Sequence, residues 1–113
     1  MKVKAYEKGG VAIIEPSGKL MGGADTGELD EKLYALLGRG ELKVIIDLGQ
    51  TDWMNSSGIA ILIHHWKKFN DAGGNLKLAN LTQKIEKIMI IAKLTTVFEV
   101  FDSLDDAIGS FAA

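Results

Sequence analysis

The residues best placed to do chemistry in this chain form a short polar segment that ends in Ser56 and Ser57. The apolar run 59–63 follows them and is typical of a helix, so the two serines are expected to open that helix. The start of a helix leaves backbone N–H groups unpaired, and its dipole favours negative charge. A serine there can cap the helix or carry a phosphate that the helix end tolerates. The local sequence alone favours capping, because Ser is among the preferred N-cap residues.

The two histidines, His64 and His65, do not turn Ser56 into a catalytic nucleophile. If they lie on the helix that Ser56 opens, His64 is ~12 Å away along the axis. A general base must lie within about 3.2 Å of the nucleophile. Adjacent helical residues also diverge by ~100°, so the pair does not chelate a metal ion. We expect both histidines to belong to a partly exposed helix face.

Three carboxylates, Asp25, Asp47 and Asp52, offer magnesium binding as an alternative. Their positions favour a helix cap, a strand-end residue and a loop residue instead. The sequence contains neither a Walker loop nor a Gly-x-Gly-x-x-Gly motif, so no cofactor or metal is predicted.

Composition narrows the class of protein. The chain has 113 residues, which predicts a single domain over 1–113. Its 13 Lys and Arg against 15 Asp and Glu give a net charge of −2, and Arg39 is the only arginine. A nucleic-acid partner is therefore not expected. The absence of cysteine, of an N-terminal apolar segment and of a run of ~20 apolar residues predicts a cytoplasmic protein without membrane insertion.

The N-terminal third predicts a hairpin and then a helix. Residues 2–8 and 11–17 read as strands joined by Gly9-Gly10, a pair that suits a tight turn. A Gly-rich loop over 19–24 follows. Asp25 is expected to cap a helix that ends near Gly38. Its inward face is predicted to consist of leucines at helical spacing: Leu29, Leu33, Leu36 and Leu37.

The rest of the chain alternates strands and helices. Strands are predicted at 42–48, 76–79 and 97–101, with helices after the serines, after Thr82 and after Ser103. The second helix should direct these residues inward: Ile59, Leu62, Ile63, Trp66 and Phe69. The third should bury Ile85, Ile88, Met89 and Ala92, and the fourth Leu104, Ala107, Ile108 and Phe111. The prediction is an α/β fold with a mixed, mostly parallel sheet of about five strands and about four helices.

This pattern resembles the STAS domain family, and most closely its free-standing bacterial anti-sigma-factor antagonists. The resemblance rests mainly on Val44-Ile45-Ile46-Asp47-Leu48 followed by Met54-Asn55-Ser56-Ser57-Gly58-Ile59. Pro16-Ser17-Gly18-Lys19-Leu20 and Val97-Phe98-Glu99-Val100-Phe101 add to it, as do Ser103 and Ala107.

The resemblance implies a non-enzymatic switch. In the family, the serine at the position of Ser56 is phosphorylated by an anti-sigma factor that is also a kinase. The unphosphorylated form captures that kinase, which frees a sigma factor for transcription, and a phosphatase restores it. Ser57 is the alternative phosphoacceptor and the more expected cap.

The expected partner surface covers 52–65 and the loop at 19–25. Its candidate contacts are Met21, Trp53, Asn55, Ser56, Ser57, Gly58 and Ile61. Gly58 would allow close backbone approach, and Trp53 is either a rim anchor for the partner or packs over the sheet edge.

Two positions depart from the family pattern. Asn55 stands where the family usually has Asp, and Met21 stands near a position that is often Asp. Some family members are never phosphorylated, so a constitutive STAS scaffold in a stressosome-like or transporter complex is the alternative. Nucleotide binding, known for some members, and a weak homodimer stay open.

Overall fold

The computed structural model describes residues 1–94 and 96–112, with only the backbone described at residue 25. The strands are β1 (Lys2–Lys8), β2 (Val11–Leu20), β3 (Lys43–Asp47), β4 (Thr51–Met54), β5 (Asn75–Ala79) and β6 (Val100–Phe101). The α-helices are α1 (Gly27–Gly38), α2 (Ser56–Asp71), α3 (Gln83–Ile91) and α4 (Leu104–Ala112), and a 3₁₀ turn, η1 (Gly23–Thr26), precedes α1.

The strands form one mixed sheet in the order β1-β2-β3-β5-β6. Strands β1 and β2 are antiparallel, and the other pairs are parallel. Gly9 and Gly10 have φ angles of 61° and 79°, the left-handed values that a two-residue hairpin turn requires. The predicted α/β fold with an N-terminal antiparallel hairpin is therefore confirmed.

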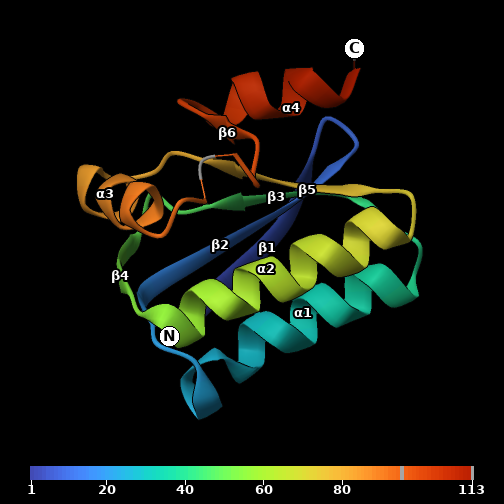
Figure 1. Ribbon diagram of the computed structural model, residues 1–113. Coiled ribbons are helices and arrows are strands. Elements are labelled where there is room, and N and C mark those ends of the chain that lie inside the picture. The colour runs from blue at the N-terminus through green and yellow to red at the C-terminus, as the bar shows by residue number, and fades with distance from the viewer. Residues whose placement is uncertain (95, 113) are drawn as a thin grey trace.

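Helices cover both faces of the sheet (Figure 1). Helices α1 and α2 lie side by side over one face, where they build the larger core cluster, and α4 covers the other face. The three innermost residues of β3, Val44, Ile45 and Ile46, are fully buried because both faces are covered. Helix α3 lies at the β4 end of the sheet.

Strand β4 was not predicted, and it changes the surroundings of the serines. It pairs in parallel with the end of β2, which extends to Leu20 instead of ending near residue 17. Strand β2 exchanges β3 for β4 as its neighbour between Ile14 and Gly18, and a register shift between Gly18 and Lys19 interrupts its pairing with β4. Four residues are too few to show periodicity, so only the tertiary pairing reveals this strand.

The start of α1 also differs from the prediction. The helix begins at Gly27, after η1, and its N-cap residue is Thr26. The Thr26 hydroxyl donates to the carbonyl of Gly23 at 3.0 Å and does not cap the helix. The predicted cap, the side chain of Asp25, lies outside the described part of the structure.

In the C-terminal part of the chain, the predicted helix caps are confirmed, but the last strand is shorter than predicted. The hydroxyls of Thr82 and Ser103 accept the backbone N–H groups of Ile85 and Asp106, at 3.2 and 3.1 Å. The last strand, however, covers only Val100–Phe101 and not 97–101. Ala92, predicted to face inward, is the exposed C-cap of α3.

Candidate functional site

Asn55, not a serine, caps helix α2. Its backbone is extended, with φ −105° and ψ −176°, and its Oδ1 accepts the N–H of Gly58 at 2.9 Å. Its carbonyl accepts the first intrahelical N–H, that of Ile59, at 2.9 Å. The predicted cap role of Ser57 is therefore wrong, because the residue one position earlier supplies the acceptor. Ser56 and Ser57 form the first turn with exposed side chains.

Gly58 lets the first turn of α2 rest on the end of β2. A Cβ at this position would lie 2.0 Å from the carbonyl oxygen of Leu20 and 3.0 Å from its Cγ. The N–H of Asn55 donates to the same carbonyl at 3.3 Å. The close approach predicted for Gly58 thus exists, but it is made to the chain's own β2, and Gly58 is buried.

The two serines have different neighbours. Ser57 lies against the loop between β2 and η1, since a Cβ on Gly22 would lie 2.6 Å from the Cβ of Ser57. That loop also carries Met21, which is 37% exposed. Ser56 instead lines an apolar groove between β4, α2 and α3. The structure therefore brings the loop that carries Met21 to the end of α2 where both serines lie.

Trp53 lies on the other side of Ser56, on β4, and is 41% exposed. The Nζ atom of Lys84, on α3, lies 5.8 Å from the centre of the Trp53 ring. The half-exposed ring is accessible to a partner, as the rim-anchor interpretation requires. Ile61, another candidate contact, is partly buried against the larger core cluster, so only part of its side chain is accessible.

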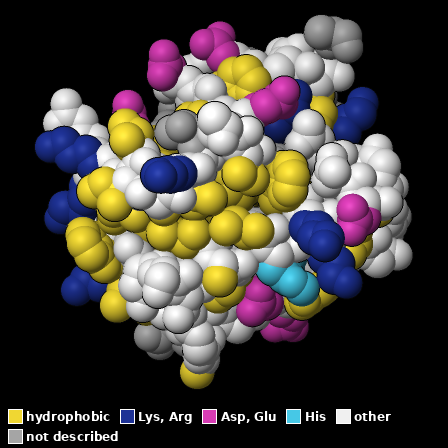
Figure 2. All heavy atoms as spheres, viewed as in Figure 1, with side chains coloured by type: hydrophobic (Ala, Val, Ile, Leu, Met, Phe, Trp, Pro, Cys, Tyr) yellow, Lys and Arg dark blue, Asp and Glu magenta, His cyan; other side chains and the backbone are white. Residues whose placement is uncertain are grey.

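The groove that Ser56 lines has a volume of about 210 Å³. Its lining residues are Trp53, Met54, Asn55, Ser56, Ile59, Ile88, Ile91 and Ala92. No charged side chain is among them. Figure 2 shows hydrophobic side chains gathered over this side of the molecule, with both Lys or Arg and Asp or Glu side chains around the patch. Sequence reasoning missed the contribution of α3, although Ile91 beside Ile90 at the end of a predicted helix was a signal.

His65 is fully buried between α2 and α1, which overturns the prediction of a partly exposed His64-His65 face. Its Nε2 lies 2.6 Å from Oδ1 of Asp30, and its ring packs edge-on against Tyr34. Its Nδ1 has no hydrogen-bond partner among the described residues. Burial lowers the pKa of His65, and the hydrogen bond to Asp30 opposes that shift in part. A neutral histidine therefore packs the two helices together.

His64 is exposed, as expected, and its Nε2 is hydrogen-bonded to the hydroxyl of Tyr34. Both histidines thus have partners on α1, and neither serves Ser56 as a base.

Of the three carboxylates considered for magnesium, Asp47 and Asp52 lie in different surroundings. Asp47 is buried, and its two oxygens accept the N–H of Gly49 at 2.9 Å and the amide of Asn80 at 3.2 Å. Asp52 is exposed on β4. Within residues 1–94 and 96–112, no cluster of three or more His, Asp or Glu side chains is placed to hold a metal ion.

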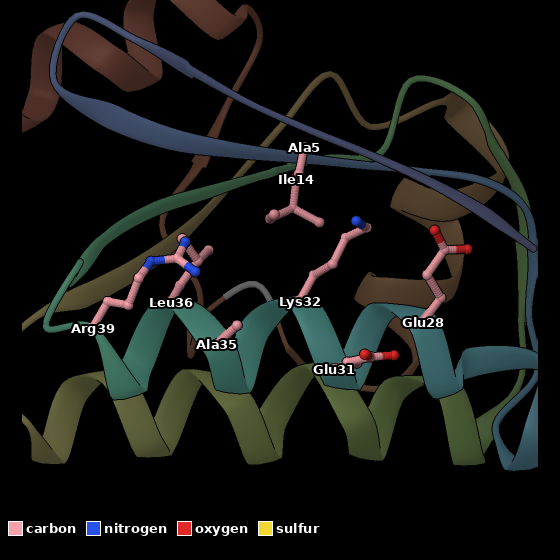
Figure 3. Close-up of a pocket in the computed structure, with 8 residues that line it drawn as sticks. All are labelled: Ala5, Ile14, Glu28, Glu31, Lys32, Ala35, Leu36 and Arg39. Atoms are coloured by element: carbon pink, nitrogen blue, oxygen red, sulfur yellow. The ribbon is translucent and has the colours of Figure 1, made fainter.

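A larger cleft, of about 570 Å³, lies between α1 and the β1–β2 hairpin (Figure 3). Its floor contains Ala5 and Ile14, and Lys32 and Glu28 extend from α1 toward the strands. Arg39 lines it as well and forms an ion pair with Glu41 at 2.8 Å. We do not choose this cleft as the candidate functional site, although it is the larger of the two. Its charged side chains are of mixed sign, and none of its lining residues comes from β4 or α2.

Comparison with known proteins identifies the family. The family model described as STAS domain matches residues 2–107. The prediction of one domain over 1–113 stays a prediction. Among the helices of the described residues, none is long and apolar enough to cross a membrane.

Relatives with this fold carry the names of anti-sigma factor antagonists. BtrV of Bordetella bronchiseptica, which carries that name, is 27% identical to this chain over 88 residues. The matched region covers 78% of this chain and 76% of BtrV. A crystal structure of a Thermotoga maritima protein with the same name superposes with a TM-score of 0.88 at 17% sequence identity. The superposition covers 98% of this chain and 95% of the Thermotoga chain. The Bacillus cell fate determinant SpoIIAA in its phosphorylated form has a TM-score of 0.75 at 15% identity, covering 97% and 99%.

Proposed function

Since this chain belongs to the STAS domain family, we propose that it is an anti-sigma-factor antagonist that binds an anti-sigma-factor kinase and is released when Ser56 is phosphorylated. One observation carries the proposal. Ser56 is exposed on the first turn of α2, is not the cap of that helix and lines an apolar groove. A modification there changes a surface and leaves the core untouched.

The helix start is suited to a phosphate. The N–H groups of Ser56 and Ser57 precede the first intrahelical donor, Ile59, and the α2 dipole places partial positive charge at this end. The first turn of α2 contains no acidic residue, and the N-cap residue before it is Asn55, where the family usually has Asp. A phosphoserine of charge about −1.5 to −2 would therefore not be repelled by its immediate neighbours on α2. The free domain should stay folded.

The complex, in contrast, would be weakened. A partner seated over Ser56 and the groove would cover a neutral hydroxyl and apolar side chains. Phosphorylation would place a dianion in that covered surface, and burying an unpaired charge costs several kcal/mol. Since ~1.4 kcal/mol is a tenfold loss of affinity, a fraction of that cost ends a moderate complex.

The chain itself supplies no catalysis in this proposal. Both histidines lie in the second half of α2 and are hydrogen-bonded to side chains of α1, whereas Ser56 lies at the start of α2. ATP and phosphoryl transfer would come from the kinase, and a phosphatase would restore the hydroxyl. The protein would act in the cytoplasm by controlling how much sigma factor is free.

The test is peptide mapping by mass spectrometry after incubation with the source organism's purified anti-sigma-factor kinases and Mg-ATP. We expect one phosphate on Ser56 and loss of kinase binding by the modified protein. Ser57→Ala should still be phosphorylated, whereas Ser56→Ala should not, although it should still bind the kinase. Phosphate on Ser57 would move the switch by one residue. No phosphate from a kinase that binds the chain would favour the constitutive-scaffold alternative.

A further inference from the structure

The surface around Ser56 contains unusually exposed apolar residues from α3. Ile91 is 80% exposed and Ile90 is 55% exposed, yet both belong to a helix that also buries Ile85 and Met89. Ile91 and Ile88 line the groove beside Ser56. Large aliphatic side chains that are left this exposed beside a concave apolar surface are typical of a docking site.

Two lysines lie beside Trp53, at the margin of the groove. Lys84 precedes Ile88 and Ile91 by four and seven positions, so it shares their face of α3, and its ammonium lies over Trp53. On the other side of Trp53, the exposed Lys19 is its register partner on β2. The groove itself is lined by no acidic residue. Although the whole chain has a net charge of −2, these two lysines place positive charge beside the Trp53 side of the groove.

We propose that the groove receives an acidic segment of the kinase partner that inserts one large apolar side chain between α3 and the first turn of α2. This inference rests on the proposed function and adds the chemistry of the partner. The apolar side chain would pack on Ile88, Ile91 and Trp53, and carboxylates beside it would face Lys84 and Lys19. Charge complementarity of this kind gives an interface its orientation and its association rate.

Two other occupants fit the groove less well. A second copy of this chain would bring the same lysines against themselves, which disfavours self-association through this face. A lipid surface has no side chain that could fill a groove, whereas this surface contains one, with a volume of about 210 Å³. That volume is also below the range of about 300–1,000 Å³ that is common for small-molecule pockets. It suits an inserted side chain.

The proposed occupant also explains why phosphorylation of Ser56 would act as an off switch. A phosphate at the rim would repel the carboxylates of the partner and compete with them for Lys84. Desolvation and like-charge repulsion would then act in the same direction. The switch would depend on the acidity of the partner segment as well as on burial.

The test measures, by calorimetry, binding of the purified anti-sigma-factor kinase to three charge variants of α3. Ile91→Glu should weaken binding about tenfold or more, because it removes the apolar contact and adds repulsion. Ile91→Lys removes the same contact without the repulsion and should weaken binding clearly less. Ile90→Glu is the matched control, since Ile90 lines a different depression with Gln83, Glu86 and Lys87. It should bind within about twofold of the wild type.

Each of the other outcomes contradicts one part of the proposal. If Ile91→Glu and Ile90→Glu both bind as the wild type does, the groove is not the docking site, while the proposed function stands. If Ile91→Lys is impaired as much as Ile91→Glu, the partner segment is not acidic. If the wild-type chain sediments as a dimer and Ile91→Glu abolishes that dimer, the groove binds a second copy of the chain. If the wild-type chain binds anionic vesicles and Ile91→Glu abolishes that binding, the groove faces a membrane. If no anti-sigma-factor kinase of the source organism binds the wild-type chain, the proposed function fails, and this inference fails with it.

Discussion

Replacing Gly58 by Ala should destabilise the domain, although the same change in most helices is favourable. The added Cβ would lie 2.0 Å from the carbonyl oxygen and 2.8 Å from the carbonyl carbon of Leu20. These are backbone atoms of β2, so no side-chain rotation relieves the overlap. Overpacking costs typically ~1–3 kcal/mol, and a backbone clash belongs at the upper end, about 3 kcal/mol. Ala gains ~1 kcal/mol over Gly in a helix, which leaves a net loss of about 2 kcal/mol.

Thermal and urea unfolding followed by circular dichroism measure this loss. For a chain of this size, a loss of about 2 kcal/mol corresponds to a fall of about 8 °C in Tm. Gly109→Ala is the matched control, because Gly109 lies in α4 with nothing within 4 Å of its Cβ position. It should raise the stability by about 0.5–1 kcal/mol. A Gly58→Ala protein as stable as Gly109→Ala would refute the close contact between α2 and β2.

Two further predictions concern the cap and the buried histidine. Asn55→Ala should lower the free energy of unfolding by ~0.5–2 kcal/mol, because the Gly58 N–H loses its acceptor, whereas Ser56→Ala should stay within ~0.5 kcal/mol of the wild type in urea titrations. Equal losses in both variants would show that the serine shares the cap. The pKa of His65 is lowered by burial in the folded state, so the unfolded state binds more protons once the pH falls below the usual histidine value. Stability should therefore be complete above about pH 6.5 and should decline as the pH falls below it. His65→Gln should lose this pH dependence, whereas His64→Gln should retain it, and unchanged slopes in both variants would contradict the buried neutral histidine.

Features that depend on neighbouring residues in the chain could be predicted from the sequence. The Gly9-Gly10 turn, the buried β3 strand and the Thr82 and Ser103 caps each involve residues within a few positions of one another. Backbone freedom, apolar runs and side-chain capping act at that range. For the same reason the sequence placed the start of a helix just after the polar segment at 52–55, whereas the choice of Ser56 as candidate phosphoacceptor came from the resemblance to the STAS family.

The position of the cap within that segment required the structure. Asn, Asp and Ser have nearly equal N-cap preferences, so the local sequence does not choose among Asn55, Ser56 and Ser57. The choice follows from β4, which is paired with β2, and from the N–H of Asn55, which donates to the carbonyl of Leu20. These contacts place the extended residue of the cap at Asn55 and release both serines to the surface.

The burial of His65 and the composition of the groove are also tertiary outcomes. The buried stripe of α2 is Gly58, Leu62, His65 and Phe69, a helical spacing that hydrophobicity alone does not mark because one member is a glycine and another a histidine. Asp30 makes that burial tolerable, and it lies 35 residues away in the sequence. Likewise, Ile88 and Ile91 meet Ser56 only because α3 packs beside β4. Local sequence thus determined the helices and most of the strands, whereas strand β4 and the surroundings of Ser56 depend on contacts between distant segments.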